Sequence, residues 1–312
     1  MQVNWFRLFV LCVALPILLS ACGQFESLSS TSSTTTNRKI LMGGAIQGTP
    51  LSLSNEVSTF AGMSPGSIDG IGTAARFNQI YAITSDGTNL YVADYADSTI
   101  RKVVIATGEV STLAGTAGVS GSMDGVGLAA TFNHPTGITT DGINLFVADS
   151  GNYTIRKIEI ISGSVTTIAG TAGNHGSEDG TGSSARFYYP SGITTDGTNL
   201  FVANNGNYTI RKIIIATAEV TTLAGTAGVS GSMDSTGTAA SFGLLGGLAT
   251  DGTYLFIADS SNNTIRKVVI ATGEVMTLAG SVGSIGAVDG TGMAARFYGP
   301  TGITTDGTNL FV

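Results

Sequence analysis

The same phrase recurs through most of this sequence at an interval of 55 residues. Its fixed point is a phenylalanine, found at Phe77, Phe132, Phe187, Phe242 and Phe297. One copy begins TFNHPTGITTDGINLFVADSGNYTIRKI at Thr131, and the next begins RFYYPSGITTDGTNLFVANNGNYTIRKI at Arg186. Self-similarity at a fixed period indicates one supersecondary unit that is stacked repeatedly, because a single unit cannot bury its hydrophobic face alone. The period therefore constrains the fold more than any single motif does.

Each repeat reads as four short strands separated by turns. In the second copy the expected strands cover residues 136–140, 144–148, 154–160 and 165–169. Asp141-Gly142 predicts the first turn, because glycine supplies a positive φ and aspartate can accept hydrogen bonds from the nearby backbone. The second strand, NLFVA, is apolar on both faces, which is typical of a strand that is covered on both sides.

Four short antiparallel strands per repeat, arranged radially, form a blade of a β-propeller. We therefore predict an all-β propeller with blades of about 55 residues, four of them complete and a fifth truncated. A two-sheet sandwich is the competing all-β fold, but it does not require a strict period. A parallel β-helix has much shorter coils.

Composition excludes several classes of protein. Glycine is abundant at 44 residues and 42% of the chain is hydrophobic, so the chain is neither collagen-like nor disordered. The formal net charge is −7, and most basic residues occur as Arg-Lys pairs spread evenly along the repeats. Nucleic-acid binding needs a concentrated basic footprint, so we do not expect it. No cysteine lies in the repeats, because the two in the chain are Cys12 and Cys22.

The N-terminus reads as an export signal. Arg7 precedes an apolar run, Leu8 to Leu19, which has the length of a signal-peptide core rather than of a transmembrane helix. The run ends in Leu-Ser-Ala-Cys, which resembles the bacterial lipobox. That resemblance implies a signal peptide over residues 1–21, lipidation of Cys22, and a lipid anchor in the cell envelope. Gly23 favours the outer membrane or cell surface. The alternative is a simple secretory signal.

A polar segment separates this signal from the repeats. Residues 22–56 include SLSSTSSTTTNRK, a low-complexity sequence that cannot bury a core and is typical of a flexible tether. Residues 57–312 then form the expected propeller domain. The chain is thus predicted to be a globular head held off a membrane.

The wording of the repeat resembles the NHL family of β-propellers. The matching elements are FNHPTGITTD, NLFVADSGNYTIRKI and VTTIAG, in fixed order, and they recur from Val57 to the end. Residues 57–61 resemble an outer strand that could complete the last blade, whereas the fifth copy stops at Val312 inside its second strand. We therefore expect a truncated array that would need about 75 more residues to reach six blades.

Two recurring sets of acidic residues invite a functional reading. One set precedes a small-residue stretch in every copy: Asp69, Asp124, Asp179, Asp234 and Asp289. We predict that these aspartates cap one-turn helices, because aspartate is a preferred N-cap; calcium binding is the alternative, but one aspartate among glycines offers too few ligands. The other set ends the second strand: Asp94, Asp149 and Asp259, with Asn204 in the third blade. We expect these to pair with the IRK arginines between neighbouring blades.

The third glycine-rich insert departs most from the others. It carries Asn174, His175, Glu178 and Asp179, which makes it the candidate binding loop, although loops also tolerate drift. His134 is a lone histidine at a position that differs in every repeat, which indicates a variable surface or channel-mouth residue. The sequence suggests no catalytic residue, metal site or cofactor.

The expected function is therefore that of a membrane-anchored extracytoplasmic propeller that binds or scaffolds a protein or polysaccharide of the cell envelope. The alternatives are a propeller enzyme, similar to metal-dependent lactone hydrolases or lyases, and a sensor domain of a signalling system. The monotony of the repeats weakens the enzymatic alternative, because an asymmetric site is not visible in them.

Overall fold

The computed structural model describes residues 57–312. The predicted signal peptide, Cys22 and the tether lie outside the described residues. Within the described part of the chain, no helix is long and apolar enough to cross a membrane. Residues 57–61, which were predicted to form an outer strand, form no strand.

The described residues form four complete antiparallel blades, each built from four consecutive strands. The first blade contains β2 (Ile80–Ser85), β3 (Asn89–Asp94), β4 (Thr99–Val104) and β5 (Glu109–Ala114). The second contains β7 (Pro135–Thr140), β8 (Asn144–Asp149), β9 (Thr154–Glu159) and β10 (Ser164–Ala169). The third contains β12 (Pro190–Thr195), β13 (Asn199–Asn204), β14 (Thr209–Ile214) and β15 (Glu219–Ala224). The fourth contains β16 (Leu245–Thr250), β17 (Tyr254–Asp259), β18 (Thr264–Val269) and β19 (Val275–Gly280).

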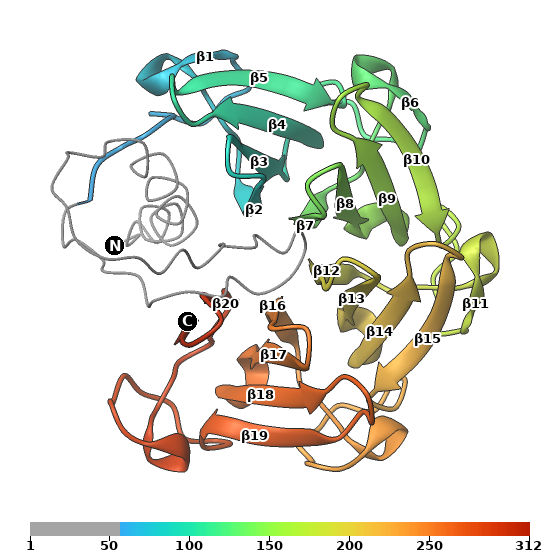
Figure 1. Ribbon diagram of the computed structural model, residues 1–312, viewed down its shortest axis with the longest axis vertical. Helices are drawn as coiled ribbons and strands as arrows, with labels where there is room; N and C mark the ends of the chain where they lie inside the picture. The colour runs from blue at the N-terminus through green and yellow to red at the C-terminus, as the bar shows by residue number, and fades with distance from the viewer. Residues whose placement is uncertain (1–56) are drawn as a thin grey trace, which may run out of the picture.

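The blades are arranged radially, as the repeat predicted. The first strand of each blade faces the centre and the fourth strand forms the outside (Figure 1). A partial fifth repeat follows as β20 (Thr304–Thr305) paired with β21 (Leu310–Phe311), and β20 lies next to β16. The prediction of an all-β propeller with four complete repeats and part of a fifth is confirmed.

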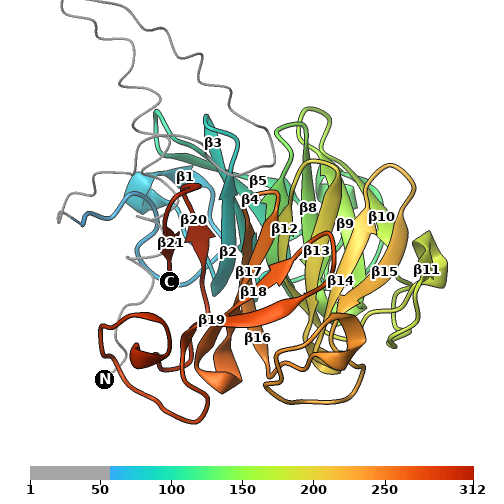
Figure 2. The ribbon, with the colours of Figure 1, turned by 60° about the horizontal axis from the view of Figure 1, so that its bottom comes forward.

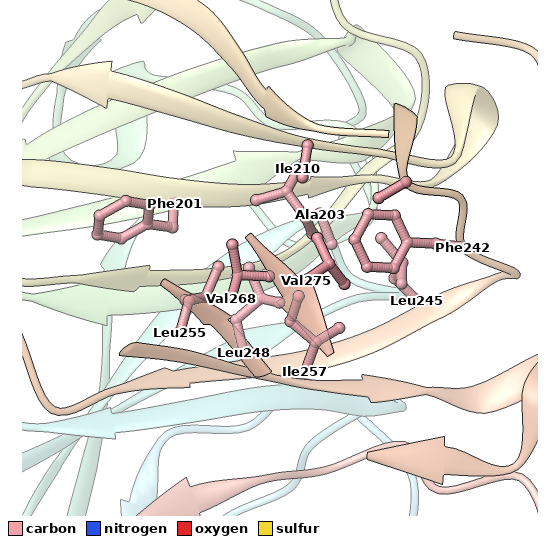
Figure 3. Close-up of a cluster of buried hydrophobic side chains, with 12 residues drawn as sticks. Phe201, Ala203, Ile210, Phe242, Leu245, Leu248, Leu255, Ile257, Val268 and Val275 are labelled. Atoms are coloured by element: carbon pink, nitrogen blue, oxygen red, sulfur yellow. The ribbon is translucent and has the colours of Figure 1, made fainter. Parts of the chain in front are cut away.

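The hydrophobic core lies between neighbouring blades. Second strands are the most buried, and all six residues of β3 are buried, as the two-sided apolar pattern predicted. Between the third and fourth blades, Phe201, Ile210 and Phe242 form one buried cluster with Leu248 and Ile257 (Figure 3). Burying apolar side chains of this size contributes roughly 1.5–3 kcal/mol each, so the blades stabilise one another.

The glycine-rich inserts form joints between blades at the outer edge. In the second insert, β6 (Gly125–Val126) pairs with β10 and is followed by the short 3₁₀ helix η3 (Gly127–Ala129). The Gly127 amide donates to the carbonyl of Gly163 in its own blade, whereas its carbonyl accepts from Gly115 at the end of the previous blade. The equivalent strand of the third insert, β11 (Gly180–Thr181), lies at the outer rim beyond β15 (Figure 2).

Candidate functional site

Each complete blade contains one buried arginine, and its surroundings explain most of the repeated residues. The arginines are Arg101, Arg156, Arg211 and Arg266, all supplied by the third strand. In the second blade the guanidinium of Arg156 lies 5.1 Å from the centroid of the Phe132 ring. Its Nη1 contacts Asp149 at 2.8 Å and its Nη2 contacts Asp124 at 2.8 Å. A cation over an aromatic face with two carboxylates at its edge is stabilised even without water.

The predicted roles of the two aspartates need correction. Asp124 caps no helix, since η3 begins without a side-chain hydrogen bond. Its carboxylate instead accepts from Arg156 and from the amide and hydroxyl of Thr167 on β10, at 3.1 and 3.0 Å. Asp149 does pair with an arginine, but within its own blade rather than with a neighbour. The cap prediction was wrong, and the pairing prediction was right about the partner and wrong about the blade.

Burial separates the pKa values of these two carboxyl groups. Asp149 is fully buried, and the loss of hydration raises its pKa to about 6 despite the nearby Arg156. Asp124 is half exposed; partial burial opposes the shift, but hydrogen bonds from Thr167 and Arg156 lower its pKa. In the third blade Asn204 replaces the buried aspartate, and burial lowers the pKa of Arg211. This network therefore belongs to the fold.

The four residues of the candidate binding loop do not converge. Asp179 pairs with Arg211 at 2.7 Å and accepts from Thr222, as its counterparts do in other blades. The Glu178 carboxylate accepts from the amide of Ser177, and the amide of Asn174 donates within a turn. His175 alone turns toward a different group of side chains. No group of three His, Cys, Asp or Glu side chains able to hold a metal ion occurs among residues 57–312.

A cavity of about 260 Å³ lies where the inner strands of the first three blades begin. Its aromatic walls are the side chains of Tyr81, Tyr95, His134 and Tyr189. Its polar walls are supplied by Thr136, Ser150, Ser191 and Asn205. Each polar residue lies either at the start of an inner strand or directly after a second strand, so the fold brings separate turns together at one end of the ring.

The aromatic side chains continue beyond the cavity as two clusters of rings. The rings of Tyr81 and Tyr95 stack with centroids 4.3 Å apart, and Tyr95 lies 4.6 Å from His134. On the other side, Tyr189 lies 4.8 Å from Tyr188. We call the whole surface the aromatic face, and its members are Tyr81, Tyr95, His134, Tyr153, His175, Tyr188 and Tyr189.

Three members of the aromatic face have unusual backbone conformations. His134 has a φ of 53°, Tyr189 a φ of 50° and Tyr153 a φ of 60°, all in the left-handed region. That region costs a residue with a side chain about 1–2 kcal/mol and is usually left to glycine. Gly299 occupies the position equivalent to His134 and Tyr189 in the fifth repeat with a φ of 55°. The turn therefore does not require an aromatic side chain at this position.

No family model matches the chain. Among curated proteins, NHL repeat-containing protein 2 of Bos taurus is 32% identical over 162 residues, which is 49% of this chain and 22% of that protein. Protein SUPPRESSOR OF QUENCHING 1, chloroplastic, of Arabidopsis thaliana is 35% identical over 133 residues, 39% of this chain and 12% of that protein. The chain is a β-propeller that is similar over part of its length to NHL repeat-containing proteins.

The match concerns the repeated part of the chain. It does not transfer the activities of the full-length relatives to this protein. The chain spans only about a fifth of the length of the bovine relative. In the crystal structure of a nidogen/laminin complex, one chain resembles this propeller with a TM-score of 0.51 at 18% identity, covering 74% of this chain and 70% of that one. At that identity the likeness concerns the fold alone.

Sequence reasoning missed the cavity, although a signal for it was present. Repeats that are otherwise nearly constant differ two residues after each phenylalanine, where they carry Gln79, His134, Tyr189, Leu244 and Gly299. They differ again directly after the second strand, where they carry Tyr95, Ser150, Asn205 and Ser260. Comparing the copies column by column would have marked these positions. His134 is one of the residues that line the cavity.

Removing the buried arginine should destabilise the second blade more than the third. Arg156→Met leaves the Asp149 carboxylate buried without its cation, and we expect a loss of about 3–5 kcal/mol in the free energy of unfolding. Arg211→Met leaves the neutral Asn204 and the half-exposed Asp179, so the loss should be clearly smaller. Chemical denaturation of both variants measures the difference.

Adding Asp149→Asn to Arg156→Met is the control, because it makes the second blade match the third. The double variant should recover stability to about the level of Arg211→Met. Equal losses of stability in Arg156→Met and Arg211→Met, without recovery in the double variant, would contradict this explanation. They would show that neutralising the buried Asp149 carboxylate is not the main role of Arg156.

The raised carboxyl pKa values should make stability depend on pH. Burial raises the pKa of Asp94 and of Asp149 to about 6, and that of Asp259 in the same direction, from an ordinary value of 3.8. The folded state then binds these protons more tightly than the unfolded state does. Their stabilising contribution is complete below pH 3.8 and is lost as pH rises through 6.

The triple variant Asp94→Asn, Asp149→Asn and Asp259→Asn should therefore lose less stability than the unaltered protein between pH 4 and 7, in thermal unfolding measured across that range. Asp124→Asn is the control, since the lowered pKa of Asp124 acts below this window. Identical pH profiles for the triple variant and the unaltered protein would contradict the assignment.

Proposed function

We propose that this propeller is the extracytoplasmic head of a lipid-anchored protein and that it binds a protein or polysaccharide of the cell envelope without catalysing a reaction. The apolar run and Leu-Ser-Ala-Cys sequence that end at Cys22 support the anchor. The polar composition of residues 22–56 supports a tether long enough to hold the head away from the membrane. An outer-membrane or cell-surface location is part of this proposal.

The cavity where the inner strands begin carries the binding part of the proposal. Its walls combine aromatic rings with hydroxyl and amide groups, which is the usual composition of a recognition site. The residues around it differ between blades, so the site is asymmetric even though the scaffold repeats. The inserts, by contrast, hold neighbouring blades together through Gly127 and its counterparts, which leaves the cavity as the better candidate for ligand contact.

An enzymatic role is the alternative. Acid–base catalysis would use a group such as His134, whose Nδ1 lies 2.7 Å from the Oδ1 of Asn133. A propeller enzyme of the metal-dependent kind would bind a metal ion in a fixed ratio. Elemental analysis of the purified full chain therefore distinguishes the two, because one tightly held metal ion per chain would favour the enzyme.

The anchor is tested by substitution of Cys22. Wild-type chain expressed in a bacterium should fractionate with membranes and incorporate a fatty-acid analogue, because acylation of the thiol supplies the anchor. Cys22→Ser should abolish incorporation, whereas Cys12→Ser should retain it, since Cys12 lies inside the apolar run. Equal incorporation by both variants would contradict lipidation at Cys22.

Binding is tested by capture from isolated cell envelopes with the full chain in detergent. We expect a defined protein or polysaccharide to be retained by the unaltered chain. The amount of ligand retained should fall at least several-fold in Tyr189→Ala, because that side chain lines the cavity. Failure to retain any envelope component would contradict the proposed function.

A further inference from the structure

Aromatic residues are concentrated on one face of this molecule far beyond their share of the chain. Aromatic residues make up 7% of the sequence, with nine tyrosines and two histidines. Five of those tyrosines and both histidines belong to the aromatic face, which spans the first three blades. Monomeric proteins rarely gather large exposed side chains without a binding role, so this surface calls for a ligand.

The side chains of the aromatic face are not needed to form the blades. At the second position of the inner strand the repeats carry Tyr81, Thr136, Ser191 and Gly246, all in the same backbone setting. Tyr81 is 57% exposed and Tyr189 is 46% exposed, so neither fills a core. Tyr189 also holds a left-handed backbone conformation that glycine adopts without strain in the fifth repeat. Gln79 holds the same conformation in the first repeat, so this turn does not require an aromatic side chain.

The aromatic rings flank the cavity as two platforms. On one side Tyr81 stacks on Tyr95 with an angle of 22° between the ring planes. On the other side Tyr188 stacks on His175 at 28°, and Tyr189 adjoins Tyr188. Tyr95 of the first platform and Tyr189, which adjoins the second, both line the cavity, so both platforms border one opening. A ligand would need apolar faces for the platforms and a polar portion for the cavity between them.

The polar groups of the cavity are uncharged, and most of their donors are already used within the protein. They are the hydroxyls of Thr136, Ser150 and Ser191 and the amide of Asn205. The Thr136 hydroxyl donates to the carbonyl of Pro190 at 3.1 Å, and the Asn205 side-chain nitrogen donates to the Ser191 hydroxyl at 2.9 Å. The Asn205 side chain is also fixed by hydrogen bonds to the amide and carbonyl of Leu245 in the next blade, at 2.6 and 2.7 Å, so the junction between the third and fourth blades holds the cavity in shape. The cavity groups therefore act mainly as acceptors, which match a ligand that donates, as the hydroxyls of a sugar do.

We propose that the aromatic face binds a neutral oligosaccharide, with sugar rings stacked on the Tyr81 and Tyr188 platforms and the intervening portion held in the cavity. Pyranose rings present weakly positive C–H groups on their faces and hydroxyls at their edges. The C–H faces suit the negative face of an aromatic ring, and the edges suit the cavity hydroxyls. This assignment rests on the proposed function, because it selects the polysaccharide from the two ligand classes named there.

The charge distribution separates this ligand from other stacking ligands. A single-stranded nucleic acid would also stack on tyrosine, but its phosphates need cations, and the cavity wall contains neither lysine nor arginine. A net charge of −7 disfavours acidic glycans for the same reason. A proline-rich peptide also docks on aromatic side chains, but it offers mainly hydrogen-bond acceptors, and the cavity groups are themselves left mainly as acceptors.

The test measures binding of the full chain in detergent to defined probes. The glycan probes are β-1,4-glucan, α-1,4-glucan, β-1,4-mannan and β-1,4-xylan hexasaccharides and intact peptidoglycan sacculi. A proline-rich peptide represents the alternative class of ligand. Tyr81→Ala and Tyr189→Ala should each weaken binding to the preferred glycan about tenfold, the equivalent of losing one stacked aromatic contact. Tyr81→Phe should retain binding within about twofold, because the ring remains.

Tyr298→Ala is the matched control, since Tyr298 is exposed and occupies the position of Tyr188 in the fifth repeat without contributing to the aromatic face. Its binding should equal that of the unaltered chain. The inference is overturned if none of the glycan probes binds, if the peptide binds in their place, or if Tyr298→Ala weakens binding as much as Tyr81→Ala does. Capture of an envelope protein that is insensitive to Tyr81→Ala would overturn the inference and leave the proposed function standing.

Discussion

A guanidinium buried against a phenylalanine ring is the interaction on which every complete blade depends. Arg156 illustrates it, because its donors reach Asp149 on the second strand, Asp124 in the insert, and the carbonyls of Met123 and Thr131. One side chain thereby connects the insert, the middle of the sheet and, through Asp124, the outer strand. A buried cation needs partners for its donors, so most of this set recurs in every complete blade. The third blade departs from it, because Asn204 replaces the buried aspartate and Arg211 pairs with Asp179. This requirement keeps the spacing of these residues constant from blade to blade.

The same requirement leaves other positions free to change. Tyr81, His134 and Tyr189 belong neither to the arginine network nor to the buried clusters, so these positions can differ from blade to blade without disturbing either. His134 and Tyr189 show how far this freedom extends, since both occupy a backbone conformation that Gly299 adopts without strain. The repeat therefore combines a fixed scaffold with a variable end, and recognition is concentrated at that end.

Sequence reasoning recovered what local patterns control. The continuous apolar run in NLFVAD predicted a strand buried on both faces, which the structure shows. The Asp-Gly pairs predicted turns, and the Asp141 carboxylate does accept from the amides of Ile143 and Asn144. It failed where partners are distant in sequence. Asp124 looks like a helix cap among its neighbours, but its true partners lie 32 and 43 residues away. The residues next to Asp124 in the sequence do not indicate which distant residues its carboxylate will contact.

The residues of the candidate loop are also separated by partners that are distant in sequence. Asp179 seemed to mark a cluster with His175, but Arg211 already binds its carboxylate, and only the histidine remains available to the aromatic face. A residue that differs from its counterparts in the other repeats can indicate a binding site only where the contacts of the buried arginine do not involve that position. In this chain such positions are found where the inner strands begin, since the core between blades and the buried arginines already supply the stability of the fold. Aromatic side chains there can then be explained by what they contact outside the protein.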